Sequence, residues 1–157
     1  MAKLLLYNPW LSVAFISWII AQVLKVLLNT WATHRVDFSR LVDSGGMPSS
    51  HTALVAGLST SVGITQGWHS YAFALVLCFS LIVIYDATNL RRSAGNHAEV
   101  LNELVAQLLK GRILRSEFVF PRLRELLGHN PFEVIVGAVL GIGIALGFSA
   151  LAPIPTR

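Results

Sequence analysis

The sequence contains little charge and a single cysteine. Only 13% of its 157 residues are Asp, Glu, Lys or Arg, whereas soluble domains carry about 25%. Together with 54% hydrophobic residues and a mean hydropathy of +0.64, this low charge excludes an ordinary water-soluble domain. The sequence also excludes an intramolecular disulfide and a cysteine-based metal site, because Cys78 is the only cysteine.

Long apolar runs are what the sequence has instead. Four stretches, 10–29, 52–67, 71–90 and 132–152, approach or reach the roughly 20 residues that cross a bilayer. The second is the shortest and is rich in Gly, Ser and Thr. We predict an all-α integral membrane helical bundle with about four transmembrane helices, formed by residues 1–157 as a single domain.

The basic residues gather in two of the predicted loops. Nine of the twelve Lys and Arg residues lie between the first and second spans or between the third and fourth. Since cytoplasmic loops hold the excess of Lys and Arg, both loops should face the cytoplasm and both termini the outside. Membrane lipids are the expected partners. Nucleic acid is not expected, because the basic residues are not interleaved with aromatics on a soluble module. The oligomeric state is left open.

The loop between the last two spans contains an amphipathic helix. Its apolar residues recur at helical spacing and alternate with polar ones: they are Ala98, Leu101, Leu104, Val105, Leu108 and Leu109. Gly111 should end this helix. We expect the helix to lie on the cytoplasmic side, either along the membrane surface or packed on the bundle.

Several polar residues approach the same predicted cytoplasmic face. Charges in or beside membrane spans are costly, so each is a candidate functional residue. The residues in question are Lys25, Asp86 and Glu133 with His51, Arg91, Arg92 and His129. Because the topology was derived from loop charge alone, their convergence predicts one polar site at that face.

The segment Gly45-Gly46-Met47-Pro48-Ser49-Ser50-His51 stands immediately before an apolar run. The glycines allow an unusual backbone, the proline stiffens the turn, and two hydroxyls precede an imidazole where a helix should begin. A helix start has unpaired N–H groups and partial positive charge, which suit a phosphate. Ordinary helix capping explains the same residues, and both interpretations stay open.

A second polar segment precedes the last span. Asn130 as N-cap, Pro131 at the first helical position and Glu133 three residues after the cap form a capping-box pattern. This pattern does not account for His129, which the Glu133 carboxylate could reach and orient. An imidazole held in one tautomer by a carboxylate is a better nucleophile or base. Capping and orienting are compatible roles for one carboxylate.

These segments, in the order in which they occur along the chain, carry a family resemblance. Pro48-Ser49-Ser50-His51 and His129-Asn130-Pro131-Phe132-Glu133, the latter followed by a glycine-rich helix, resemble motifs of the type 2 phosphatidic acid phosphatase and vanadium-dependent haloperoxidase superfamily. The fuller pattern, which includes Tyr-Asp-Ala-x-x-Leu-Arg-Arg-x-Ala-Gly at 85–95, is similar to the divergent bacterial and plastid branch. These segments extend over about Lys25 to Gly141.

The resemblance implies a phosphatase that hydrolyses lipid phosphomonoesters, such as phosphatidic acid or phosphatidylglycerophosphate, without a metal or other cofactor. Carried over, His129 would attack phosphorus, Glu133 would orient it and His51 would protonate the leaving oxygen. The phosphoryl oxygens would be held by Lys25, Gly46, Ser49, Ser50 and either Arg91 or Arg92, with Asp86 in support. The phosphorylated lipid would be bound at the cytoplasmic face.

The sequence also departs from that pattern. The family's arginine six residues before the second histidine is replaced by Leu123, and Glu133 stands where the family has Asp. The main alternative is therefore a catalytically degenerate member that binds anionic lipid or a protein. A transporter or channel subunit that uses Lys25 and Asp86 as an ion path is a third hypothesis, although no inverted repeat is visible. His97, six residues after Arg91, lacks an acid four residues later and is expected on the surface of the amphipathic helix.

Overall fold

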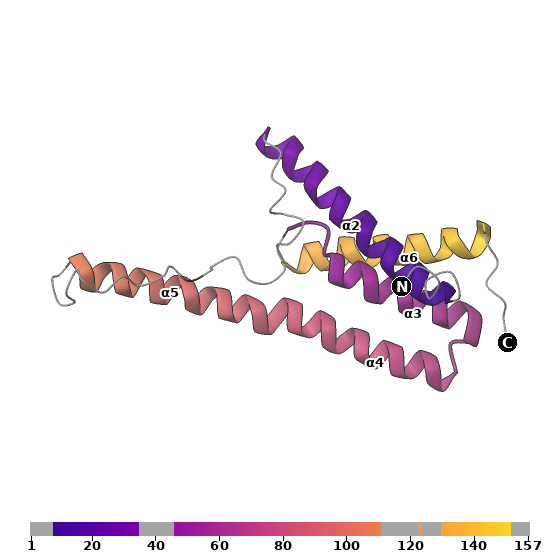
Figure 1. The fold of residues 1–157 in the computed structure, drawn as a ribbon. Coiled ribbons are helices and arrows are strands. Elements are labelled where there is room, and N and C mark those ends of the chain that lie inside the picture. The colour runs from indigo at the N-terminus through magenta and orange to yellow at the C-terminus, as the bar shows by residue number, and fades with distance from the viewer. Residues whose placement is uncertain (1–7, 35–45, 111–122, 124–129, 152–157) are drawn as a thin grey trace.

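The computed structural model describes residues 8–34, 46–110, 123 and 130–151, except for the side chains of Arg91 and Arg92. All the regular structure in these described residues is helical. In chain order (Figure 1) the helices are α2 (Pro9–Thr33), α3 (Ser50–Gln66), α4 (Tyr71–Tyr85), the π-helical turn η2 (Asp86–Leu90), α5 (Arg91–Lys110) and α6 (Pro131–Leu151). The predicted all-α membrane bundle is confirmed.

Three helical segments in the described residues are long and apolar enough to cross a membrane: Pro9–Thr33, Tyr71–Lys110 and Pro131–Leu151. They correspond to three of the four predicted spans. The fourth, α3, has 17 residues, fewer than the roughly 20 that a span requires. Because its Gly, Ser and Thr side chains are small, α3 packs inside the bundle, and its crossing of the membrane stays a prediction.

Polar caps fix where the membrane helices begin. The Asn8 side chain accepts a hydrogen bond from the Leu11 amide at 3.2 Å, and Pro9 follows at the first helical position. At the start of α4, Ser70 Oγ accepts from the Phe73 amide at 3.2 Å. Each bond satisfies an N–H group that the first helical turn cannot pair internally, so each helix has a defined start at the edge of its apolar run.

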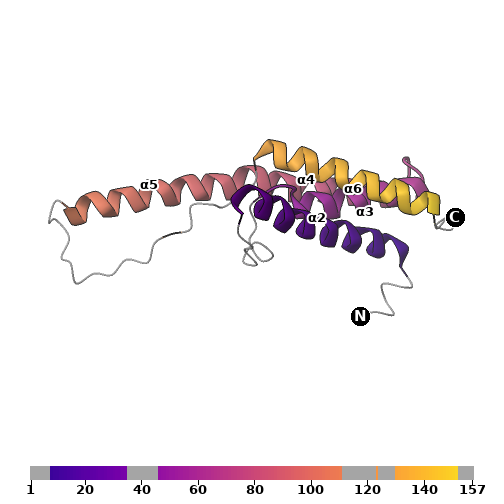
Figure 2. The same ribbon diagram turned by 90° about the horizontal axis from the view of Figure 1, so that it is seen from above.

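Helix α3 is the centre of the bundle, and α2, α4 and α6 pack around it (Figures 1 and 2). The contacts are close because small residues face each other. A Cβ on Gly57 would lie 2.6 Å from Ser17 Oγ of α2, and a Cβ on Gly141 of α6 would collide with the Ala53 carbonyl oxygen of α3. Close approach of backbones at small residues is a principal source of helix association in lipid.

Helix α5 continues from α4 through η2 and projects beyond the bundle (Figures 1 and 2). The expected amphipathic helix is thus present. It does not pack against the described helices of the bundle (Figure 1), and its expected position along the membrane surface stays a prediction. Residues 86–94 contain neither Gly nor Pro, so no residue there interrupts the main-chain hydrogen bonding of the helix. Asn102 bonds through its side chain to the Leu123 carbonyl oxygen at 2.9 Å and to the Leu123 amide at 3.0 Å.

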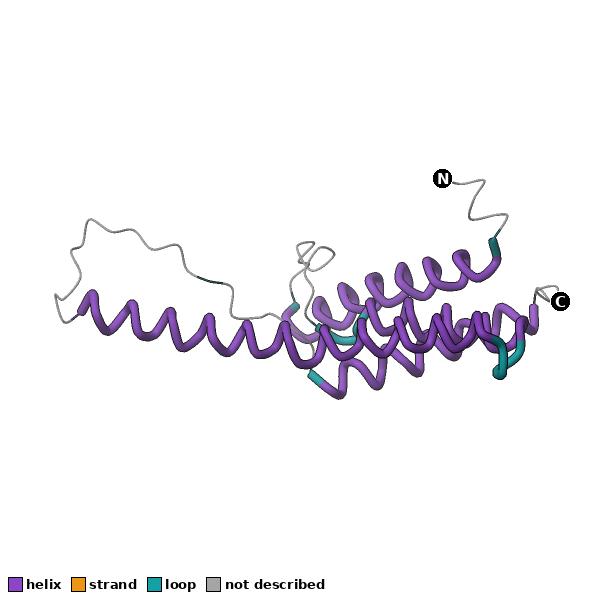
Figure 3. The backbone as a smooth tube through the Cα atoms, turned by 90° about the horizontal axis from the view of Figure 1, so that it is seen from below, coloured by secondary structure: helices purple, strands orange, loops and turns teal. Residues whose placement is uncertain are grey.

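Aromatic residues mark both ends of α2. Trp10 and Trp31 are 21 residues apart, which corresponds to about 31 Å of α-helix, close to the roughly 30 Å hydrocarbon core of a bilayer. The start of α2, the end of α6 and the α3–α4 turn lie together at one end of the bundle (Figure 3). Trp68 lies in that turn and Tyr71 is the first residue of α4, an arrangement typical of an interfacial aromatic belt.

Candidate active site

The start of α3 holds a group of buried polar side chains. Ser49 is 0% exposed, Ser50 1% and Lys25 of α2 2%, and His51 is half-buried. Moving an ammonium group from water into a protein interior costs several kcal/mol unless the surrounding groups compensate. The burial of Lys25 beside a helix start is therefore the arrangement expected of a functional cation.

Gly46 and Lys25 lie against each other. Gly46 has φ +99°, and a Cβ placed on it would lie 3.4 Å from Lys25 Cγ and 3.5 Å from Lys25 Cδ. A positive φ of this size is open to glycine and strained for other residues. The turn between Gly46 and α3, which contains a cis peptide bond before Pro48, thus runs beside the aliphatic part of the lysine. The structure brings these two predicted phosphate ligands together.

The starts of α3 and α6 are joined directly. The Ser49 amide donates to the Glu133 carbonyl oxygen at 3.0 Å. One turn further along α6, a Cβ on Gly137 would lie 2.5 Å from the Ser49 carbonyl oxygen and 3.2 Å from Thr52 Cβ. The two sequence motifs therefore meet at one end of the bundle, although His51 and Glu133 are 82 residues apart in the sequence.

The Ser49 hydroxyl has a defined hydrogen-bonding role. Its oxygen accepts from the Thr52 amide at 3.3 Å and from Thr52 Oγ1 at 3.0 Å. A serine hydroxyl has two acceptor lone pairs and one donor hydrogen, so these bonds occupy its acceptor capacity and leave the O–H as the donor. Since the Ser49 amide is bound by Glu133, the hydroxyl is the group of Ser49 that suits an anion. Both predicted interpretations of this segment, cap and anion donor, are compatible with this geometry.

Thr52 was not singled out from the sequence, yet it fixes the orientation of the Ser49 hydroxyl. Its side chain is 0% exposed. The sequence signal that could have identified Thr52 is its position three residues after Ser49. From that position both its amide and its hydroxyl can reach the side chain of an N-cap serine. Thr52 thus acts as a positioning residue for Ser49.

The predicted capping box at α6 is present. The Asn130 amide donates to Glu133 Oε2 at 3.3 Å, and Asn130 Oδ1 accepts from the Phe132 amide at 3.3 Å. The Glu133 side chain is half-buried. His129 lies outside the described residues, so its orientation by Glu133 stays a prediction.

The remaining predicted residues belong to the α4–α5 rod. Asp86 is half-buried at the first position of η2. Arg91 and Arg92 open α5, and their side chains lie outside the described part of the structure. His97 is exposed on α5, as expected. Among the described residues there is no group of three or more His, Cys, Asp or Glu side chains placed to hold a metal ion.

The described site therefore combines a buried cation, an oriented hydroxyl donor and the start of a helix. All three features stabilise negative charge. A half-buried imidazole, His51, stands in the first turn of the same helix, where it can exchange a proton with a bound group. This combination suits the binding of an anion such as a phosphoryl group.

Comparisons with known proteins identify the family of the chain. Residues 6–144 match the family model described as the Divergent PAP2 family. The chain is 40% identical over 137 residues to the uncharacterized membrane protein YuiD of Bacillus subtilis (strain 168), with 82% of this chain and 85% of the relative covered. No solved structure matches. The sequence motifs, the helical membrane bundle and the family match agree, and the chain belongs to the Divergent PAP2 family.

Proposed function

We propose that the protein is a metal-independent lipid phosphate phosphatase that acts at the cytoplasmic face of a membrane. The observation that supports this function best is the buried Ser49 hydroxyl, whose acceptor positions are occupied by Thr52 and whose O–H is therefore a donor. It lies in the same motif as Gly46, against which the buried Lys25 packs. Hydroxyl, ammonium and helix start are donors of the kind that stabilise the charge of a transferring phosphoryl group.

The proposed reaction has two steps. In the first, an imidazole nitrogen of His129 attacks phosphorus, the bond between phosphorus and the lipid oxygen breaks, and His51 gives its proton to the leaving oxygen. This produces a lipid alcohol and a phosphohistidine. In the second, His51 takes a proton from water, the oxygen of that water attacks phosphorus, and inorganic phosphate leaves as His129 is regenerated.

The other predicted residues have supporting roles in this reaction. Glu133 orients His129 while its carboxylate also caps α6. Lys25, Ser50, the backbone at Gly46 and Arg91 or Arg92 join Ser49 in holding the phosphoryl oxygens, and Asp86 supports the basic side chains. Charge on the phosphoryl group is then met by protein donors and cations.

The substrate class follows from the position of the site. The site lies at one end of a bundle whose helices are long enough to cross a membrane, so a bound phosphomonoester would be presented by a molecule whose chains remain in the bilayer. Phosphatidic acid and phosphatidylglycerophosphate both have this form. The basic loops favour the cytoplasmic face for the site.

Phosphate release by the detergent-purified full chain tests this function. The protein is incubated in EDTA with phosphatidic acid and with phosphatidylglycerophosphate, beside the variants His51→Ala and His129→Ala. We expect the wild type to release phosphate from at least one lipid. The rate of phosphate release should be about 100-fold or more lower in each variant. Equal release by all three proteins would reject the mechanism, and activity that requires added metal would reject metal independence.

One observation favours a second function, namely binding of an anionic lipid without turnover. The protein has Leu123 in place of the family's arginine. In that case vanadate and phosphatidic acid would bind, Lys25→Met would weaken binding of both, and the wild type would release no phosphate. Binding and release measured on the same preparation distinguish the two functions.

A further inference from the structure

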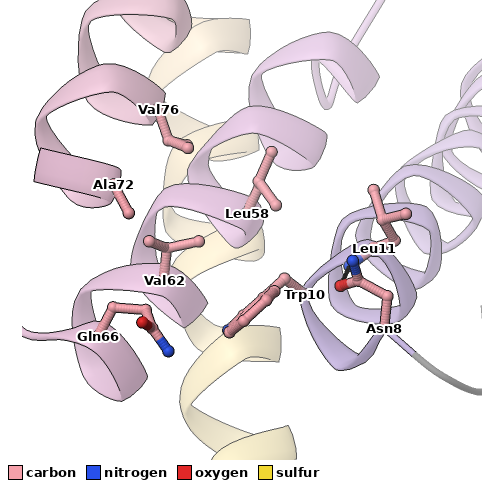
Figure 4. Close-up of a pocket in the computed structure, with 8 residues that line it drawn as sticks. All are labelled: Asn8, Trp10, Leu11, Leu58, Val62, Gln66, Ala72 and Val76. Atoms are coloured by element: carbon pink, nitrogen blue, oxygen red, sulfur yellow. Dashed lines mark hydrogen bonds between the residues drawn. The ribbon is translucent and has the colours of Figure 1, made fainter. Parts of the chain in front are cut away.

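A second hollow lies at the opposite end of the bundle from the candidate active site. It is an open groove with a volume of about 260 Å³, lined by the start of α2, the second half of α3 and the start of α4 (Figure 4). Its apolar lining includes Leu11, Leu58, Val62 and Val76. An apolar cavity does not retain water, and hydrocarbon surrounds these helices in a membrane.

The hollow exists because α2 and α4 both pack on α3 from different sides. Trp10 spans part of the gap between them, and its indole Nε1 donates to Thr65 Oγ1 of α3 at 2.7 Å. That bond fixes the ring as one wall of the hollow (Figure 4). This wall of the hollow is thus built by a defined interaction between α2 and α3.

The dimensions of the hollow match one lipid chain. From Leu58 to Gln66 the lining of α3 extends over eight residues, about 12 Å of helix, and one leaflet of the hydrocarbon core is about 15 Å deep. In the predicted topology the Leu58 end would lie near the middle of the bilayer, whereas Gln66 is the last residue of α3. A chain that enters at the membrane surface would therefore lie along α3 for most of one leaflet.

The surface end of the hollow carries two amides, those of Asn8 and Gln66 (Figure 4). Asn8 uses its Oδ1 to cap α2, whereas the side-chain amide of Gln66 makes no hydrogen bond to another described residue. An amide N–H at the depth where hydrocarbon gives way to headgroups can donate to the carbonyl oxygen of a fatty ester. The lining is thus apolar where a chain would lie and polar where its ester would lie.

We propose that this hollow binds one acyl chain of an ester-linked phospholipid from the leaflet opposite the active site, with Gln66 as donor to the ester carbonyl. The lipid fills the space between α2 and α4 and links both to α3. This site is independent of the proposed phosphatase function, because the hollow shares no lining residue with the candidate active site.

Lipid retention by the full chain tests the proposal. The protein is purified in detergent, mixed with dioleoyl phosphatidylglycerol and analysed by native mass spectrometry, beside Ala72→Phe, which would fill the hollow. The matched control is Ala74→Phe, because Ala74 is exposed on the same helix and does not line the hollow. We expect one lipid per chain for the wild type and the control, and at least a tenfold weaker complex for Ala72→Phe. Equal retention by all three would overturn the proposal, as would a dimer that Ala72→Phe dissociates.

The variant Gln66→Leu tests the amide and does not depend on the behaviour of Ala72→Phe. We expect about fivefold weaker binding of the ester-linked lipid, the loss that corresponds to one hydrogen bond. For the dialkyl ether analogue, which lacks the carbonyl, Gln66→Leu and the wild type should bind with equal affinity. An equal loss for ester and ether lipids, or no loss for either, would overturn the assigned role of Gln66.

Discussion

The Ser49 amide donates a hydrogen bond to the Glu133 carbonyl oxygen, with an N···O distance of 3.0 Å. This bond joins the start of α3 to the start of α6, so the two motifs that resemble catalytic motifs are held at one place. The contact continues one turn along α6, where Gly137 lies against the Ser49 carbonyl oxygen. The geometry of the site thus depends on close packing of two helices.

Gly137→Ala should therefore disturb the site. The added Cβ would lie 2.5 Å from the Ser49 carbonyl oxygen, so one helix must move, at a cost of about 1–3 kcal/mol. We expect lower thermal stability and at least tenfold less phosphate release. Gly143→Ala is the control, because a Cβ there meets nothing within 4 Å; it should leave both properties unchanged. A Gly137→Ala protein that equals the wild type in both would contradict the packing described.

Ser49→Ala should separate capping from function. Ser49 and Ser70 are both N-caps, with cap distances of 3.3 and 3.2 Å to the amides that they bind, but only Ser49 belongs to the candidate site. Each alanine variant should lose about 1 kcal/mol of stability, measured by thermal unfolding in detergent. Phosphate release should fall by about 10- to 100-fold for Ser49→Ala alone. Equal activity in the two variants would show that Ser49 is only a cap.

Lys25→Met should remove the buried cation while keeping a side chain of similar length. Without the ammonium group, phosphoryl oxygens lose a charged partner, and kcat/KM should fall by about 100-fold or more. Lys110→Met, at an exposed position on α5, is the matched control and should not change kcat/KM. Helicity and elution volume would be recorded for both, and an unchanged kcat/KM in folded Lys25→Met would exclude the lysine from the site.

The predicted topology can be tested with cysteine labelling. In a Cys78→Ser background, His69→Cys places a thiol in the α3–α4 turn and Glu99→Cys places one on α5, both at exposed positions. In intact cells a membrane-impermeant maleimide should label His69→Cys, and it should label Glu99→Cys only after the membrane is opened. The reverse pattern would place the candidate site on the outer face.

Much of the fold was predictable because apolar length and capping residues are local signals. Asn8 with Pro9 and Asn130 with Pro131 start their helices as such residues normally do. The central position of α3 was not predicted, although its small residues explain the close packing. The direction of α5 was not predictable, since charged residues at Arg91 and Arg92 mark a membrane boundary but do not end a helix.

The residues of the candidate site were selected from the sequence, whereas their geometry could not be predicted from it. Lys25 and Gly46 are 21 residues apart in sequence, and only tertiary packing places the lysine stem against the glycine. The role of Thr52 depends on the rotamer of a buried hydroxyl, which no sequence pattern specifies. The Ser49–Glu133 bond likewise joins main-chain groups, and main-chain contacts between distant helices leave no residue-specific signal.

The proposed phosphohistidine can be measured directly by rapid quenching of the protein after mixing with phosphate-labelled phosphatidic acid or phosphatidylglycerophosphate. Labelled phosphate should remain on the wild-type chain in base and be released in acid, as a phosphoramidate is. His129→Ala should carry no label, whereas the control His97→Ala should be labelled like the wild type. Phosphate release with no label on the chain, or a label that persists in His129→Ala, would contradict the proposed mechanism.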